Sequence, residues 1–187
     1  MRSVSVRKAV ITAAATLLVA VCGGFVTAAP ARAQLGSVVP VRAKLGVLLP
    51  QDGDTKGFGG DVLYGGEIDV TVPLPGAGQT VFTAGYYEGR NSGRKYRVIP
   101  LTISQVFSPP NPAAGLTGNV YFGLGAGAYL LRASGGGVSD EKTTFGGFAL
   151  AGYQFPNAFF VEGKYHVAGI VGGLSPNGLS FLLGRRF

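Results

Sequence analysis

The stretch VYFGLGAGAYL, residues 120–130, alternates two kinds of side chain along its whole length. Every second residue is apolar: Val120, Phe122, Leu124, Ala126, Ala128 and Leu130. The residues between them are Tyr121, Gly123, Gly125, Gly127 and Tyr129. A period of two predicts a β-strand with two different faces, and the three glycines leave room for large side chains from across a barrel. One face is therefore expected to meet an apolar environment.

The same alternation recurs on both sides of this stretch and predicts seven further strands. Four precede it, at 41–49, at 62–72, at 81–87 and in the segment that ends at Phe107, and three follow it, at 144–155, at 159–167 and from Gly178 onward. Turn-forming residues such as Pro73-Leu74-Pro75-Gly76 separate several of them. The fold is predicted to be all-β, with eight strands.

For two strands the pattern does not decide which face points outward. In the third strand the two faces are not cleanly separated, and in the sixth strand Phe148 and Leu150 compete with Ala149 and Ala151 for the apolar side. Pro100 interrupts the fourth strand and predicts a bulge or a locally missing hydrogen bond, because proline has no backbone N–H to donate.

The connections between the strands alternate in kind. Polar or glycine-rich connections follow the first, third, fifth and seventh strands, at 50–58, 88–95, 132–142 and 168–177, and turn-rich ones lie between them. An even number of strands places both ends of the domain on one side of a membrane. This arrangement is typical of outer-membrane barrels, which have longer extracellular loops and shorter periplasmic turns.

The N-terminal segment, residues 1–33, has the features of a secretory signal peptide. Three basic residues precede a largely apolar stretch, and a small-x-small cleavage site follows it; they are Arg2, Arg7 and Lys8, then Ala9 to Val26, then Ala31 and Ala33 before Gln34. An uncleaved anchor helix is the alternative, but Gly23 and Gly24 and the cleavage site favour removal. Residues 34–187 are then a single domain.

Removal of this segment changes the cysteine content and the net charge of the chain. Cys22 is the chain's one cysteine, so the mature domain would have no disulfide, and Val21 before it argues against lipid attachment. The segment holds four of the sixteen basic residues and none of the nine acidic ones, which lowers the formal charge from +7 to +3. The remaining cations are scattered, so no nucleic-acid partner is expected.

Charged residues lie on the faces opposite the long apolar rows. We predict that they form a charge cluster in the lumen, made of Arg42, Lys44, Glu67, Asp69, Glu162, Lys164 and His166. A soluble barrel of the lipocalin type would show the inverse pattern, with an apolar interior and a polar exterior. A sheet in hydrocarbon must close, because each unpaired backbone group costs several kcal/mol there. The prediction is an antiparallel up-and-down transmembrane barrel whose interior side chains fill it.

The strand 159–166, the stretch 121–127 and terminal Phe187 resemble the small outer-membrane β-barrel family, which includes OmpA-like, OmpX-like and porin-family barrels. The resemblance implies that the outer-membrane assembly machinery reads a terminal signal, here Phe181, Leu183 and Phe187. The chain departs from the family pattern at Arg185, where an apolar or aromatic residue is usual. It also lacks Trp, so that Tyr and Phe would form the interfacial belts.

Three alternative sites have weak support. A lipid A deacylase of the PagL kind would need a serine where Ala168 stands, and an omptin-like protease would be larger. The segment from Asp52 to Leu63 approaches a calcium-loop pattern, but Lys56 and Leu63 occupy ligand positions. The glycines of 123–127 are followed by no helix that could receive a phosphate. No metal or other cofactor is expected.

We therefore expect a monomeric, non-enzymatic barrel in the outer membrane of a diderm bacterium, in contact with outer-membrane lipid. Its role, adhesion or envelope integrity, would be carried by the extracellular loops. One alternative is a narrow channel for small solutes, of the porin type. A second is a membrane-embedded lipid-modifying enzyme that uses His166 with Glu162.

Overall fold

The computed structural model describes residues 40–72, 78–109, 117–135 and 138–187. The predicted signal peptide and its cleavage site at Ala31 and Ala33 lie outside these described residues. The described residues from Pro40 onward belong to one compact unit.

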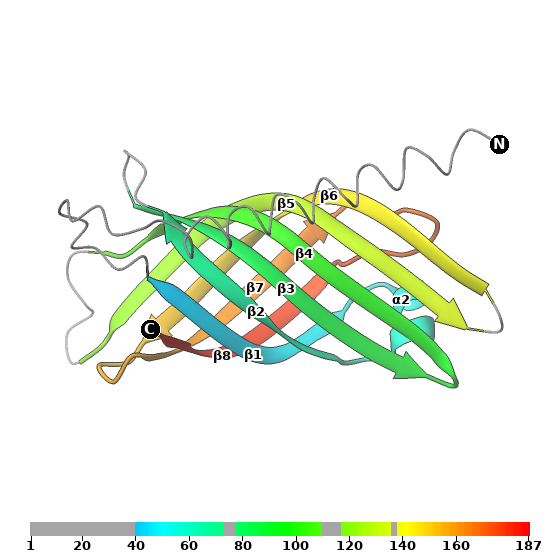
Figure 1. Cartoon of the computed structure of the whole chain (residues 1–187), viewed down its shortest axis with the longest axis horizontal. Coiled ribbons are helices and arrows are strands. Elements are labelled where there is room, and N and C mark those ends of the chain that lie inside the picture. Colours follow the sequence, from blue (N-terminus) through cyan, green and yellow to red (C-terminus); the bar gives the residue numbers. More distant parts are fainter. Residues whose placement is uncertain (1–39, 73–77, 110–116, 136–137) are drawn as a thin grey trace, which may run out of the picture. The chain divides into compact units, whose positions relative to one another are not determined.

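Eight antiparallel strands form a closed barrel in chain order within the described residues. They are β1 (Val41–Pro50), β2 (Leu63–Val72), β3 (Gln79–Asn91), β4 (Arg94–Phe107), β5 (Asn119–Gly135), β6 (Val138–Gln154), β7 (Phe159–Ala168) and β8 (Gly178–Arg186) (Figure 1). The predicted all-β, eight-stranded, up-and-down architecture is confirmed. No helix in the described part of the chain is long and apolar enough to cross a membrane.

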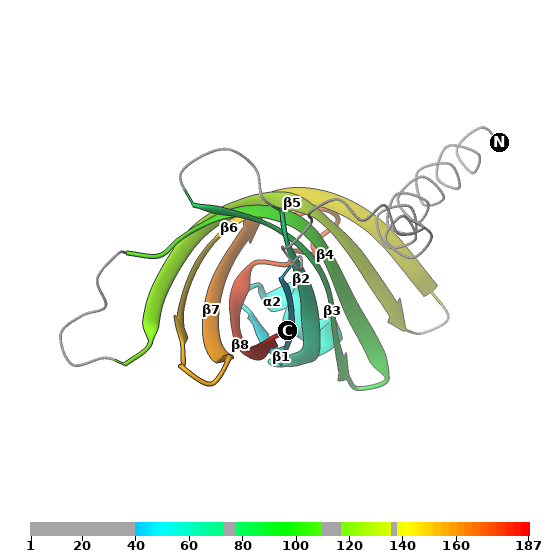
Figure 2. The same cartoon turned by 60° about the vertical axis from the view of Figure 1, so that its left-hand side comes forward.

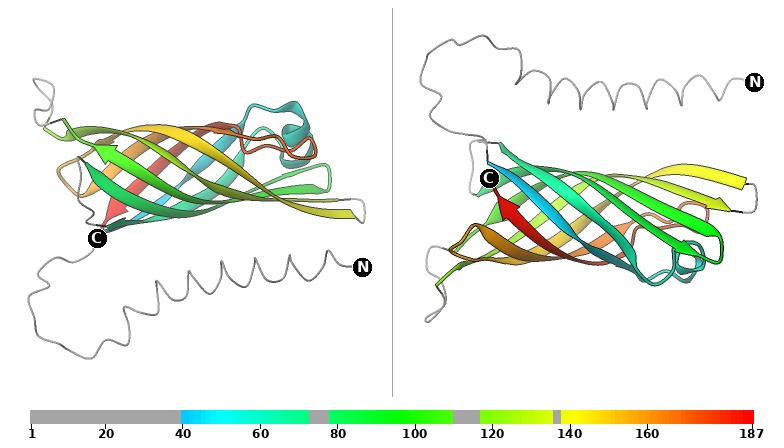
Figure 3. Two further views of the ribbon diagram at one scale, coloured as in Figure 1. Left: turned by 90° about the horizontal axis from the view of Figure 1, so that it is seen from above. Right: turned by 60° about the horizontal axis from the view of Figure 1, so that its bottom comes forward.

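The first and last strands close the barrel. β1 pairs with β8 from Arg42 opposite Arg186 to Pro50 opposite Gly178, and the backbone N–H of Phe187 donates to the carbonyl of Val41 at 2.9 Å. The start of β1 and the end of β8 lie at the same end of the barrel, which we call the C-terminal end (Figure 3). Because every strand pairs with a neighbour on each side, the sheet has no unpaired edge strand.

The strands differ in length, and this shapes the opposite end. β3 to β6 have 13 to 17 residues, whereas the other four have 9 or 10. The long strands extend past their neighbours at the end away from the C-terminus (Figure 1). A short helix, α2 (Gly53–Gly59), lies at this end, which we call the α2 end.

The helix α2 was not expected, since 50–58 was predicted as a polar loop. The carboxylate of Asp52 accepts hydrogen bonds from the backbone N–H and the hydroxyl of Thr55, which caps the first turn. The helix ends at Gly60, whose φ of 80° favours glycine. Local capping therefore gives this loop a structure that period-two patterning does not show.

The structure decides the two faces that the sequence left open. In β3, Phe82 and Tyr86 are exposed on the outer wall, whereas Tyr87 is buried inside. In β6, Phe148 and Leu150 point inward, at 5% and 6% exposure. The interior therefore contains apolar rings as well as charges.

The glycines of β5 explain why β6 takes this facing. A Cβ atom on Gly125 would lie 2.4 Å from the Cζ atom of Phe148, which is the residue opposite it on β6. The space above the glycines is therefore filled from the neighbouring strand, and not from across the barrel as the sequence suggested. Close approach of a ring to the backbone requires glycine here.

Pro100 interrupts the pairing of β4 without shifting it. Ala84 pairs with Leu101 and Tyr87 with Val98, which is one continuous register, while the two positions between them on β3 are unpaired. The sequence allowed either a bulge or a missing hydrogen bond, and the structure has the second. On its other side Pro100 keeps its place opposite Tyr129 of β5.

Candidate functional site

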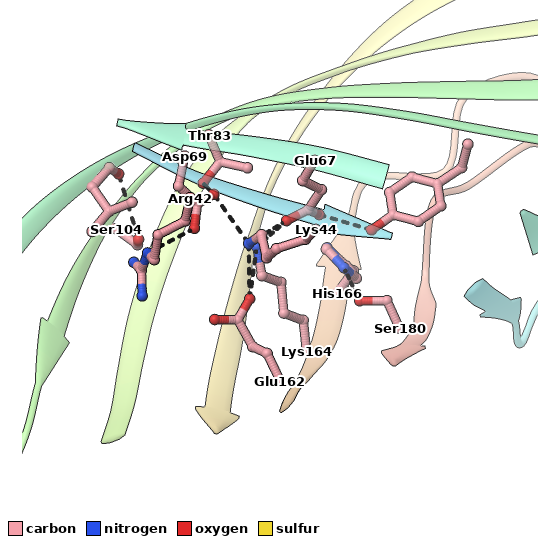
Figure 4. A network of polar contacts seen from close by, with 12 residues as sticks. Arg42, Lys44, Glu67, Asp69, Thr83, Ser104, Glu162, Lys164, His166 and Ser180 are labelled. Atoms are coloured by element: carbon pink, nitrogen blue, oxygen red, sulfur yellow. Dashed lines mark hydrogen bonds and ion pairs between the residues drawn. The ribbon is translucent and has the colours of Figure 1, made fainter. Parts of the chain in front are cut away.

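The interior of the barrel contains a network of ionic and hydroxyl side chains (Figure 4). Alternation along β1, β2 and β7 turns their charged residues inward, because the apolar residues between them face out. The seven residues predicted for the lumen are all buried: Arg42, Lys44, Glu67, Asp69, Glu162, Lys164 and His166. They come from three strands that are brought together only when the barrel closes.

Lys44 is at the centre of this network. Its Nζ atom lies 2.6 Å from a carboxylate oxygen of Glu67, 3.0 Å from one of Asp69 and 2.9 Å from one of Glu162. The Lys44 side chain has 0% exposure. Three carboxylates share this one ammonium group, which offers three N–H donors.

Two further cations complete the balance. The Nζ atom of Lys164 lies 2.6 Å from Glu67 and 3.4 Å from Glu162. The Nε atom of Arg42 lies 3.4 Å from Asp69, and the guanidinium group lies over the rings of two aromatic residues, Tyr121 and Phe160. The network therefore holds three cations and three carboxylates, so it carries no formal net charge while His166 is neutral. Buried charges persist only when they are paired in this way.

A set of hydroxyl groups supports the carboxylates. Tyr87 donates to Glu67 at 2.8 Å, Tyr121 donates to Glu162 at 3.0 Å, and Thr83 donates to Asp69 at 2.8 Å. The sequence analysis did not assign these residues to the site. Tyr121 is on the predicted inner face of its strand, and this placement could have assigned it to the site. The sequence pattern did not decide whether Thr83 and Tyr87 face inward or outward.

His166 is next to this network but has its own partners. One ring nitrogen lies 3.1 Å from the hydroxyl of Tyr129 and the other 3.1 Å from the hydroxyl of Ser180. Glu162 lies four residues away on the same strand face, and it contacts Lys44, Lys164 and Tyr121. The structure does not bring His166 and Glu162 into contact. Ser180 is a neighbour that the sequence analysis missed, since it belongs to β8.

The α2 end is closed by a second cluster, made of α2 and the β7–β8 connection. The hydroxyl of Thr55, which donates to Asp52 at 2.9 Å, accepts from the backbone N–H of Ser175 at 3.1 Å and lies 3.2 Å from the Ser175 carbonyl. The Tyr96 hydroxyl donates to the same carbonyl at 3.1 Å, and Leu174 packs into the apolar cluster beneath. Seen in Figure 2, α2 lies within the outline of the strands. Polar and apolar contacts thus cap this end.

The outer wall is apolar around its circumference. Large exposed hydrophobic residues occur on all eight strands, among them Leu45, Tyr64, Ile68, Phe82, Ile103, Leu124, Phe145, Val167 and Leu183. A continuous apolar surface of this size is exceptional for a protein surrounded by water.

The residues of the predicted assembly signal are on this wall. Phe181, Leu183 and Phe187 are 51%, 56% and 67% exposed. Arg185 is beside them, with its guanidinium group 5.6 Å from the ring of Phe159 and 5.5 Å from that of Phe187. Stacking on two rings shields this cation on an otherwise apolar face.

The described residues contain no group of three or more histidine, cysteine or acidic side chains that could hold a metal ion. In the segment that approached a calcium-loop pattern, Asp52 instead caps α2. The interior network is a set of compensated charges held by ion pairs and by hydrogen bonds from hydroxyl groups.

No protein-family model matches the chain, and no curated protein matches it. The crystal structure of the N-terminal β-barrel domain of OprF from Pseudomonas aeruginosa is similar, with 16% identity and a TM-score of 0.47, over 79% of this chain and 97% of that one. The closed eight-stranded barrel described above is the fold that the resemblance to OmpA-like small barrels implied.

Proposed function

We propose that this chain is a non-enzymatic outer-membrane β-barrel protein with a closed, polar lumen, whose role is carried by the loops at the α2 end. The observation that carries the proposal is the division of the barrel into an apolar outer wall and a charge-balanced interior. Adhesion and envelope integrity are the two roles that exposed loops on a rigid barrel would serve.

The outer wall supports the membrane location. Exposed residues such as Leu45, Leu124 and Phe145, at 75%, 68% and 75% exposure, would have an unfavourable free energy in water. In hydrocarbon they would be well solvated, and the closed strand pairing would satisfy the backbone groups along the barrel. Transfer into a lipid bilayer therefore suits both the side chains and the backbone.

The packing of the interior favours a closed lumen and not a channel. Lys44, Glu67 and Glu162 bridge the lumen with contacts of 2.6 to 2.9 Å, and Tyr87 and Phe160 fill space beside them at 1% exposure. Eight strands give an interior that side chains just fill. A solute would have to break ion pairs in a region of low dielectric constant, which is costly.

The orientation follows from the two ends. The start of β1 and the end of β8 lie at the C-terminal end, and so do the strand ends that flank the turn-rich connections, so we place that end in the periplasm and the α2 end outside. The assembly machinery of the outer membrane would read the segment that ends at Phe187. The protein is proposed to act as a monomer, because one chain closes the barrel.

Heat-modifiable migration tests the barrel and its location together. A closed barrel in an isolated outer-membrane fraction resists detergent, so unheated and boiled samples should migrate differently on a gel. A matched sample unfolded in urea before loading provides the control, and it should migrate like the boiled one. Equal migration of unheated and boiled membrane samples would refute the proposal.

Planar-bilayer recording and lipid analysis test the two alternatives. The closed lumen predicts no single-channel conductance for the purified protein, and steady conductance would favour the channel. His166→Ala should leave the lipid profile of the cells unchanged, and Ser180→Ala, which removes the hydroxyl beside His166, should do the same. A changed profile in either variant would favour the enzyme.

A further inference from the structure

A basic surface interrupts the outer wall near the α2 end, on β3 to β6, with its cations on β3, β4 and β5. Two cross-strand rows of outward-facing residues form it, as the strand register shows. The first row is Glu88, Arg97, Arg132 and Glu141, and the second, one step further from the C-terminal end, is Arg90, Lys95, Ser134 and Ser139. We call these eight residues the basic rows.

The basic rows contain more cations than acids. The carboxylate of Glu88 has three cations within 4 Å, at 2.7 Å from Lys95, 3.3 Å from Arg97 and 3.2 Å from Arg90. One carboxylate cannot neutralise three cations, so a positive excess remains at this point. Arg132 is opposite Glu141 on β6, and its Nε atom donates to the neutral hydroxyl of Ser139 at 3.4 Å. With Glu141 counted, four cations in the basic rows face two carboxylates, so a positive excess remains.

Two arginines in the first row directly oppose each other. Arg97 and Arg132 are paired residues on the neighbouring strands β4 and β5. Like charges that face each other across a strand pair destabilise the sheet. Glu88, 3.3 Å from Arg97, and Glu141, opposite Arg132, offset part of this repulsion. A bound anion between the two guanidinium groups would remove the rest, and guanidinium groups bind phosphate in bidentate fashion.

The apolar wall begins one step below the arginines. Ile99 is opposite Leu130 on the same two strands, two residues from Arg97 and Arg132, and Leu101 is opposite Ala128 in the step after that. An anion at the arginines would thus be adjacent to a surface for acyl chains. An amphiphile with a phosphate head group would contact both the arginines and the apolar wall. A free phosphate ion would contact the arginines alone.

We propose that the basic rows bind the phosphate group of an anionic membrane lipid, with Arg97 and Arg132 as its principal donors and Lys95 and Ser134 beside them. The acyl chains would lie along the apolar wall below. The inference rests on the proposed function, since it requires the barrel to be embedded in a bilayer. It adds a specific lipid class as a partner on one side of the barrel.

The test uses the protein purified from membranes and placed in nanodiscs of equal parts phosphatidylglycerol and phosphatidylcholine. Native mass spectrometry after detergent release measures which lipid stays bound. The wild-type protein should retain phosphatidylglycerol in preference. Arg97→Gln with Arg132→Gln should weaken this binding about 25-fold, at about fivefold for each arginine near a membrane surface.

A matched variant separates a specific site from general charge. Lys56→Gln with Lys142→Gln removes the same charge at the same end of the barrel from two residues outside the basic rows: Lys56 is on α2, and Lys142 is opposite buried Leu131 on the inner face of β6. Each of these lysines is paired with an acidic residue. This control should retain the lipid preference. Arg132→Lys keeps the charge but not the bidentate guanidinium group, so it should retain more of the binding than Arg132→Gln and less than the wild type.

The outcomes are distinguishable. If the wild type shows no preference, or if the control loses as much binding as the double arginine variant, the lipid site is wrong. If inorganic phosphate at the concentration of the lipid headgroups displaces the lipid, the site takes a free anion and the inference also fails. Each sample is checked for heat-modifiable migration. A wild-type protein that fails this check refutes the barrel proposal itself, and lipid binding is compared among the variants that pass it.

Discussion

Replacement of Lys44 by methionine should be among the most destabilising single changes in the barrel interior. The substitution keeps the length of the side chain but removes the ammonium group, which contacts three carboxylates at 2.6, 3.0 and 2.9 Å. After the change, two cations would face three carboxylates in a space without bulk water. Loss of one partner of a buried pair costs 3 to 5 kcal/mol, and the shared position of Lys44 predicts about 5 kcal/mol.

A second substitution tests whether charge balance is the cause. Glu162→Gln removes a carboxylate that contacts Lys44 and Lys164, and alone it should cost about 3 kcal/mol. Together the two changes restore equal numbers of cations and carboxylates. The double variant should therefore lose about 5 kcal/mol rather than the additive 8, which is a coupling energy of about 3 kcal/mol.

The assay is equilibrium unfolding in urea of the protein in phosphatidylcholine vesicles, followed by circular dichroism and by the unheated band on a gel. Lys142→Met is the control, because its pair with Asp140 has side chains 28% and 51% exposed and should contribute less than about 1 kcal/mol. The reasoning is refuted if Lys44→Met costs no more than this control. Additive losses in the double variant would also refute it, since they would mean that water screens the interior pairs.

Three further outcomes are expected. Gly125→Ala should cost about 1 to 3 kcal/mol in the same unfolding assay, because the new Cβ would lie 2.4 Å from Phe148, whereas Gly163→Ala, with its nearest atoms at 4.0 Å, should be close to neutral. Phe187→Ala should lower the heat-modifiable fraction in cell membranes while unfolding of the purified barrel changes little, and an equal loss in both would argue against an assembly role. Thr55→Val should speed proteolysis of α2 and hydrogen exchange in the β7–β8 connection, through the loss of hydroxyl contacts worth about 1 to 3 kcal/mol, and unchanged exchange would show that the cap does not depend on them.

The sequence alone determined the architecture and the inner and outer faces of most strands. The side chains of a strand alternate from face to face whatever the strand pairs with, so the placement of Arg42, Lys44 and Glu67 against an apolar row is visible in the chain itself. Eight such segments, separated by turn residues, also give the strand number, which the structure confirms. These features depend on residues that are close in sequence.

Only the tertiary structure decided which inner residues meet. Lys44 and Glu162 are 118 residues apart, and His166 reaches Ser180 only because β7 and β8 pair in one particular register. The inward facing of Phe148 depends on the glycines of the strand beside it, and the α2 cap depends on contacts between Thr55 and a connection 120 residues away. The physical reason is that alternation is a local property of each strand, whereas register and closure are fixed by the packing of all eight strands around one shared interior.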